Sequence, residues 1–102
     1  MHQEISVHEL RTALAEGARL IDVREPAEFS EAYIAGAELV PLATLPTFDG
    51  IAPGETVYVT CKSGGRSAMG CEFLNASGVQ AFNVLGGMMA WLYAGFEAKT
   101  TE

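Results

Sequence analysis

The chain has 102 residues, of which 49% are hydrophobic and 19% are charged, and this composition is typical of one compact globular domain rather than of a disordered protein. At this length, a mechanism that needs a cleft between two domains is excluded. Thirteen acidic and six basic residues give a net charge of −7, so we expect neither nucleic acid nor an anionic membrane surface as a partner.

The first half of the chain alternates helical and strand-like segments. Its start, MHQEISVHELRTALAEG, lacks the charged region and apolar run of a secretory signal, so we expect a cytoplasmic protein. Ser6 and Glu9 have the spacing of a capping box, which predicts a helix through about Glu16. The other elements predicted here are a buried strand at 19–23 (RLIDV), a helical turn at 26–29 and a short strand at 37–40.

The second half contains the clearest strand, at 56–60 (TVYVT). The elements predicted after it are a glycine loop at 61–67 (CKSGGRS), a helix at 68–76, a strand at 81–85, a glycine turn at 86–87 and a helix at 88–94. The glycine turn is expected to let the last helix pack closely on the sheet. Strands that alternate with helices predict an α/β fold with a parallel sheet covered on both faces. Ligands of such folds lie beyond the carboxyl ends of strands, where Cys61 falls.

The loop that begins at Cys61 has features that favour a thiolate. The glycine pair 64–65 can adopt positive φ, so successive backbone N–H groups can point at one anion above the sheet. Ser67 is placed to cap the following helix, whose positive end faces the sulfur, and Lys62 and Arg66 add positive charge. Because a thiolate of low pKa is a nucleophile, we predict that Cys61 is catalytic. The alternative is a buried cysteine that ends a strand before a solvated turn.

Cys71 is interpreted in the opposite way. It lies in the middle of a predicted helix beside Glu72 and has no basic neighbour in the sequence, so we expect it to fill the core. The alternative is that it resolves an oxidised Cys61. Two cysteines are too few for a disulfide framework or a zinc cluster.

A few other polar residues are candidates for the site. Arg24 is a possible accessory residue because it follows a strand and could reach the same end of the sheet as the reactive cysteine, although a salt bridge to Glu28 is the structural alternative that we favour. Asp22, inside an apolar strand, is expected to tie down a neighbouring loop. His2 and His8 have no ligand partners, so we predict no metal and no organic cofactor.

Taken together, four segments resemble a known family. They are 22–29 (DVREPAEF), 34–37 (IAGA), 59–67 (VTCKSGGRS) and 85–91 (LGGMMAW). In this order and spacing they resemble a single-domain rhodanese, a thiosulfate sulfurtransferase-type module, from Ile5 to about Phe96. The resemblance implies one rhodanese-like domain over residues 1–102, with a five-stranded parallel sheet and helices on both faces. Tyr33 and Ala35 depart from the family pattern, in which many relatives carry histidine and proline there.

The resemblance also implies a reaction. Cys61 matches the family's sulfur-accepting cysteine, and its substrate-binding loop is matched by Lys62, Ser63, Gly64, Gly65, Arg66 and Ser67. In the implied ping-pong scheme, the thiolate takes the outer sulfur of a small anionic donor such as thiosulfate, and sulfite leaves. The resulting persulfide passes to cyanide or to a thiol acceptor such as thioredoxin or glutathione. Lys62 and Arg66 would bind the sulfonate of the donor.

Two other functions fit this architecture. Four residues separate Cys61 from Arg66, whereas the related cysteine phosphatases carry one more, so the loop leaves room for about one sulfur atom rather than a phosphoryl group. The second alternative is a non-enzymatic binding or sulfur-carrier module for a protein partner. The retained cysteine favours the enzyme. Thiosulfate, glutathione persulfide and a desulfurase persulfide all suit the loop as donors, and the sequence does not indicate the oligomeric state.

Overall fold

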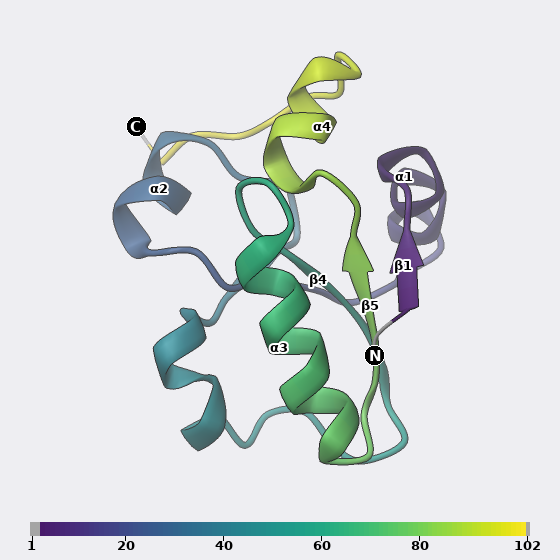
Figure 1. The fold of residues 1–102 in the computed structure, drawn as a ribbon. Helices are drawn as coiled ribbons and strands as arrows, with labels where there is room; N and C mark the ends of the chain where they lie inside the picture. The colour runs from purple at the N-terminus through teal and green to yellow at the C-terminus, as the bar shows by residue number, and fades with distance from the viewer. Residues whose placement is uncertain (1–2, 102) are drawn as a thin grey trace.

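Residues 3–101 are described by the computed structural model, and they form an α/β fold around a parallel sheet (Figure 1). Within this range, five strands pair in the order β1-β5-β4-β2-β3, and every neighbouring pair is parallel. The strands are β1 (Gln3–Ile5), β2 (Leu20–Asp22), β3 (Glu38–Leu39), β4 (Thr56–Thr60) and β5 (Gln80–Val84). The predicted α/β fold with five parallel strands is confirmed.

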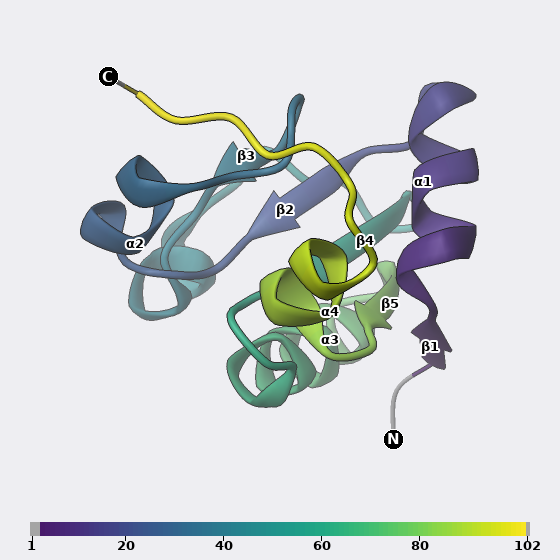
Figure 2. The ribbon, with the colours of Figure 1, turned by 90° about the horizontal axis from the view of Figure 1, so that it is seen from above.

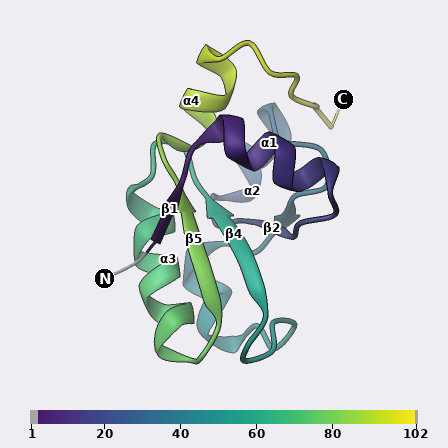
Figure 3. The same ribbon diagram turned by 90° about the vertical axis from the view of Figure 1, so that its right-hand side faces the viewer.

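Helices cover both faces of the sheet, as Figures 2 and 3 show from two directions. The helical elements are α1 (Val7–Ala15), α2 (Pro26–Glu31), α3 (Gly65–Ala76), α4 (Gly87–Tyr93) and the short 3-10 helix η1 (Leu42–Thr47). On one face, Cys71 and Leu74 of α3 pack with Leu45 of η1 against the strands. On the other face, α1 and α4 enclose a second core, to which they contribute Leu10 and Trp91. None of the helices among the described residues is long and apolar enough to cross a membrane.

The capping box predicted at the start of α1 is present. The backbone N–H of Glu9 donates to Ser6 Oγ and that of Ser6 donates to Glu9 Oε1, both at 3.0 Å, so two N–H groups at the helix start are satisfied. Two elements were not predicted from the sequence, the edge strand β1 and the helix η1. β1 has three residues, two of them exposed, and therefore carries no hydrophobic alternation that a sequence pattern could reveal.

The carboxyl ends of the central strands meet at one edge of the sheet. β4 ends at Thr60 and is followed directly by Cys61, while its neighbours β2 and β5 end at Asp22 and Val84. Since all of these strands are parallel, the segments that follow them lie at the same edge. This arrangement brings Arg24, the cysteine loop and the start of α4 together.

Candidate active site

The sulfur of Cys61 lies in a cradle of hydrogen-bond donors. Its side chain is only 1% exposed. The backbone N–H of Gly64 donates to Sγ at 3.1 Å, and Ser67 Oγ lies 3.3 Å from the same sulfur. The cradle exists because the loop turns sharply between β4 and α3, which brings its N–H groups back toward the residue that started it. Such a cradle suits a negatively charged sulfur.

Hydrogen bonding decides the acidity of this thiol. Burial by itself would raise the pKa of Cys61, but the hydroxyl of Ser67 and the backbone N–H groups of Ser67, Gly64 and Ser63 outweigh it. The net effect places the pKa of Cys61 below the ordinary value for a cysteine. Each of these groups is a donor that gains strength when the sulfur is charged, so the site favours the thiolate.

The glycine pair of the loop plays a narrower role than its sequence suggests. Gly64 has φ +112°, a left-handed conformation that glycine adopts without strain, and it is the N-cap of α3. Gly65 is already the first residue of the helix and is not among the glycines with positive φ in the described chain. The predictions that Ser67 caps the helix and that the helix begins at 68 were therefore wrong. Ser67 lies within the first turn, and its hydroxyl faces the sulfur instead of a backbone N–H group.

Asn83, which the sequence analysis missed, supports the loop from the neighbouring strand β5. Its Oδ1 lies 2.5 Å from Ser67 Oγ, and its Nδ2 donates to the carbonyl oxygen of Gly64 at 3.2 Å. The side chains of Ser67 and Asn83 are 0% and 4% exposed. The available signal was an amide in the otherwise apolar predicted strand 81–85, since a buried amide needs hydrogen-bond partners. Its partners, Ser67 and Gly64, lie 16 and 19 residues away in the sequence and could not be identified from it.

Arg66 lies near the site but is already paired. Its guanidinium makes two parallel hydrogen bonds to the carboxylate of Glu28 on α2, with N–O distances of 2.7 and 2.9 Å. This contact, reinforced by a backbone hydrogen bond at Glu25, lowers the pKa of Glu28 to about 2, so the ion pair persists at neutral pH. The same carboxylate raises the pKa of Arg66. An anionic donor would therefore have to compete with Glu28 for this charge.

Arg24 has a structural role at the end of β2. The residue is 4% exposed, and its side chain donates to both oxygens of Asp22 at 2.8 to 3.0 Å. It also donates to the backbone carbonyls of Glu28 at 3.3 Å and Ala32 at 2.7 Å, which fasten α2 to the sheet. The structural alternative was right in kind, but the carboxylate partner is Asp22 and not the predicted Glu28. Asp22 thereby ties down the neighbouring segment, as expected.

A cavity of about 180 Å³ lies beside the cysteine loop. Its apolar wall comes from Met88, Met89 and Leu92 of α4, and its charged wall includes Lys62 of the loop and Glu28 and Glu31 of α2. Lys62 is exposed and has no ion pair among residues 3–101. Of the two cations of the loop, it is therefore the one that a donor could engage without breaking an ion pair of the described residues.

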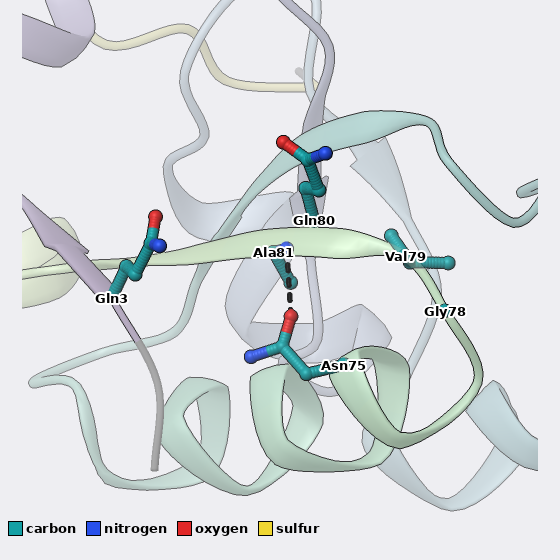
Figure 4. Close-up of a pocket in the computed structure, with 6 residues that line it drawn as sticks. All are labelled: Gln3, Asn75, Gly78, Val79, Gln80 and Ala81. Atoms are coloured by element: carbon teal, nitrogen blue, oxygen red, sulfur yellow. Dashed lines mark hydrogen bonds between the residues drawn. The ribbon is translucent and has the colours of Figure 1, made fainter.

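A larger cavity of about 340 Å³ lies elsewhere, around the start of β5 (Figure 4). Neutral side chains and backbone line it, and the labelled Asn75 uses its Oδ1 to accept a hydrogen bond from the backbone N–H of Ala81 at 2.9 Å. Its six lining residues include no nucleophilic or titratable side chain. The cavity beside the loop is therefore the better candidate for substrate.

The histidines show no sign of metal binding within the part of the chain that the structure describes. His8 packs edge-on against the ring of Phe96, with a centroid distance of 5.2 Å. His2 lies outside the described residues. Between residues 3 and 101, no group of three or more histidine, cysteine, aspartate or glutamate side chains is arranged to hold a metal ion.

Cys71 lies in the core between α3 and the sheet and is 0% exposed. Burial raises the pKa of its thiol to about 12, so it stays protonated at neutral pH and is a poor nucleophile. We expect Cys71→Ala to leave sulfur uptake by Cys61 unchanged and to lower the free energy of unfolding by about 1 kcal/mol through loss of packing. Mass spectrometry after treatment with a sulfur donor, together with denaturant unfolding, checks both effects. Loss of multiple turnover with an intact first transfer would instead make Cys71 a resolving cysteine.

Comparisons with known proteins show the family of the chain. The family model described as "Rhodanese-like domain" matches residues 6–94. A sulfurtransferase of Allochromatium vinosum is 33% identical over 106 residues, which cover 100% of this chain and 99% of that protein. The putative sulfurtransferase YtwF of Bacillus subtilis is 37% identical over 92 residues, covering 87% of this chain and 89% of that protein.

Solved structures show the same fold. The crystal structure of a rhodanese-like domain protein from Staphylococcus aureus superimposes with a TM-score of 0.87 at 36% identity, and the match covers 98% of this chain and 99% of that one. Some curated relatives are much longer, because this chain spans 48% of the length of one and 24% of another.

Proposed function

Because the chain belongs to the rhodanese-like domain family, we propose that it transfers a sulfane sulfur from thiosulfate or a related persulfide donor to a thiol or cyanide acceptor, through a persulfide on Cys61. Relatives named sulfurtransferases support sulfur transfer in general. The observation that carries the proposal is the sulfur of Cys61, held at the carboxyl end of β4 with the N–H of Gly64 at 3.1 Å.

The two half-reactions follow from this placement. In the first, the Cys61 thiolate attacks the outer sulfur of thiosulfate, the bond between the two donor sulfurs breaks, and sulfite leaves with the bonding electron pair. In the second, the thiolate of glutathione, thioredoxin or another acceptor attacks the terminal sulfur, and the pair of the breaking S–S bond returns to Cys61. Both steps begin and end with a negative sulfur at the loop, where the backbone donors stabilise it.

Sulfur loading of the purified protein tests this function directly. The reduced protein is incubated in turn with thiosulfate, 3-mercaptopyruvate and glutathione persulfide, and its intact mass is measured. We expect the mass of one added sulfur atom, which cyanide then removes as thiocyanate. A binding module without sulfur chemistry would gain no mass with any of the three donors, and that outcome would overturn the proposal. The donor that loads fastest identifies the substrate class.

Arg66 and Glu28 provide a test of whether the donor is anionic. If the guanidinium binds the sulfonate, Arg66→Ala should lower kcat/KM for thiosulfate about 10- to 150-fold, the loss expected for one charged hydrogen-bond contact. Glu28→Gln should raise it about 3- to 10-fold because the guanidinium no longer has a competing carboxylate. An alkyl persulfide has no sulfonate, so its kcat/KM should change much less in both variants. Equal changes for both donors would show that Arg66 supports the loop and would contradict an anion-binding role.

A further inference from the structure

The hydroxyl of Ser67 has two neighbours that compete for one proton. Its oxygen lies 3.3 Å from Cys61 Sγ and 2.5 Å from Asn83 Oδ1. A serine hydroxyl carries a single proton, although its oxygen can also accept hydrogen bonds. Ser67 is 0% exposed and Asn83 is 4% exposed, so bulk water does not supply either group with another partner. The hydroxyl therefore cannot donate to the sulfur and to the amide oxygen at the same time.

The orientation of the Asn83 amide is fixed by its other contact. Nδ2 donates to the carbonyl oxygen of Gly64 at 3.2 Å. Turning the amide over would place Oδ1 against that carbonyl, so that two acceptors faced each other without a proton between them. The oxygen of the amide consequently faces Ser67, and because a carbonyl oxygen can only accept, the hydroxyl proton is drawn toward Asn83.

The two protonation states of Cys61 differ in how this chain of groups is satisfied. In the thiol state, the S–H group donates to Ser67 Oγ, and the Ser67 hydroxyl donates to Asn83 Oδ1, so each group has its partner. In the thiolate state, the sulfur needs a donor, and Ser67 must turn its proton away from Asn83 to provide one. The amide oxygen then loses its partner in a buried environment, which costs free energy.

We propose that Asn83 is a positioning residue that holds Cys61 back from ionising, by competing with the sulfur for the hydroxyl proton of Ser67. The backbone donors of the loop favour the thiolate, and Asn83 opposes them through Ser67. This balance makes the resting cysteine less susceptible to oxidation, because the thiolate is the form that oxidants attack. The proposal rests on Cys61 being the nucleophile of the proposed function, but it concerns only the ionisation of the thiol.

The other charged and titratable groups around Cys61 do not obscure the titration of its thiol. On the elements packed against the loop they are Arg66 and Cys71 of α3, Lys62 of the loop, Asp22 and Arg24 at β2, and Glu28 of α2. Arg66 is neutralised by Glu28, and Arg24 by Asp22. The pKa of Glu28 is about 2 and that of Cys71 about 12, so neither changes charge near neutral pH. A titration observed there reports Cys61 itself.

The test is the pH dependence of alkylation, which needs no sulfur donor. The rate of reaction with iodoacetamide is measured against pH in a Cys71→Ala background, in which Cys61 is the remaining cysteine. Ser67→Ala removes a donor to the thiolate and should raise the midpoint by about one pH unit. Asn83→Leu frees the hydroxyl proton for the sulfur and should lower the midpoint by about half a unit to one unit. The two substitutions therefore shift the midpoint in opposite directions.

The double variant separates competition for the proton from support of the loop. Without the Ser67 hydroxyl, Asn83 has no proton to compete for, so Ser67→Ala with Asn83→Leu should titrate like Ser67→Ala alone. Asn83→Ala serves as a second variant if leucine impairs folding, which thermal unfolding monitors. The proposal is overturned if the Asn83 variants leave the midpoint unchanged or raise it. It is also overturned if they lower the midpoint equally without Ser67, because Asn83 would then act through Gly64. Failure of sulfur loading would leave this result unaffected and would count only against the proposed function.

Discussion

Replacing Cys61 by serine should abolish sulfur uptake while the fold stays intact. The thiolate is the group that attacks the donor, and a serine hydroxyl is a far weaker nucleophile unless a base lies next to it. The side chain that hydrogen-bonds to the sulfur is Ser67, at 3.3 Å, and its hydroxyl in turn contacts Asn83; neither side chain is a base at neutral pH. We therefore expect no added sulfur in the intact mass after incubation with any donor.

The stability of this variant should change little. Oxygen is smaller than sulfur, but it accepts the same hydrogen bonds from the loop, so we expect the free energy of unfolding to fall by about 1 kcal/mol or less. Circular dichroism and denaturant unfolding measure this change. Cys71→Ala is the matched control, because it removes the other thiol from the core and leaves the loop untouched. Turnover retained by Cys61→Ser would remove Cys61 from the role of nucleophile.

The sequence predicted those parts of the fold that depend on local patterns. The apolar run at 56–60 and the glycines after it were enough to place Cys61 at the end of a strand and before a helix, as the structure shows. The capping box at Ser6 was equally local, because both of its hydrogen bonds join residues three positions apart. Such features are encoded within one turn of chain and need no knowledge of the tertiary fold.

The parts that were missed depend on pairing between distant segments. Arg66 lies 38 residues from Glu28, and Asn83 lies 16 residues from Ser67, so no spacing in the sequence indicates either contact. The start of α3 was misplaced for a related reason. A serine before an apolar run resembles an N-cap, but the tertiary fold places Gly64 there in a left-handed conformation and gives the hydroxyl of Ser67 a different partner. The chemistry of the loop was thus predictable in kind, whereas the side chains that tune it were not.

Position 87 requires glycine because the backbone of the active-site loop lies close to it, which the sequence does not show. The sequence suggested that this pair lets α4 approach the sheet, but the contact is with the active-site loop. A Cβ on Gly87 would overlap the carbonyl oxygen of Cys61 and lie 2.9 Å from the carbonyl carbon of Lys62. The following N–H groups, of Met88 and Met89, donate to these two carbonyls at 2.8 and 2.9 Å. The start of α4 therefore holds the backbone of the loop in place, and only a residue without a side chain permits that approach.

Gly87→Ala should consequently damage both stability and activity. The φ of +57° adds about 1 kcal/mol of strain for alanine, and the overlap with rigid backbone adds about 1–3 kcal/mol. At about 4–8 °C per kcal/mol for a domain of this size, this loss of about 2–4 kcal/mol should lower the Tm by roughly 10–30 °C. Because the overlap moves the carbonyl of Cys61 and with it the N–H cradle, kcat/KM should fall by about 100-fold at a temperature where the variant is still folded.

Gly36→Ala is the matched control for this prediction. Gly36 has φ +87°, so alanine there carries a similar strain, but its Cβ would meet no atom of the described chain within 4 Å. We expect this variant to lose about 1 kcal/mol of stability and to keep full sulfur uptake. The difference between the two variants isolates the contact with the loop from the conformational cost of the alanine. Suppose that Gly87→Ala loses no more stability than Gly36→Ala and loads sulfur at the same rate as that control. The loop would then adjust to the added Cβ at little cost, and the start of α4 would not fix the geometry of the cradle.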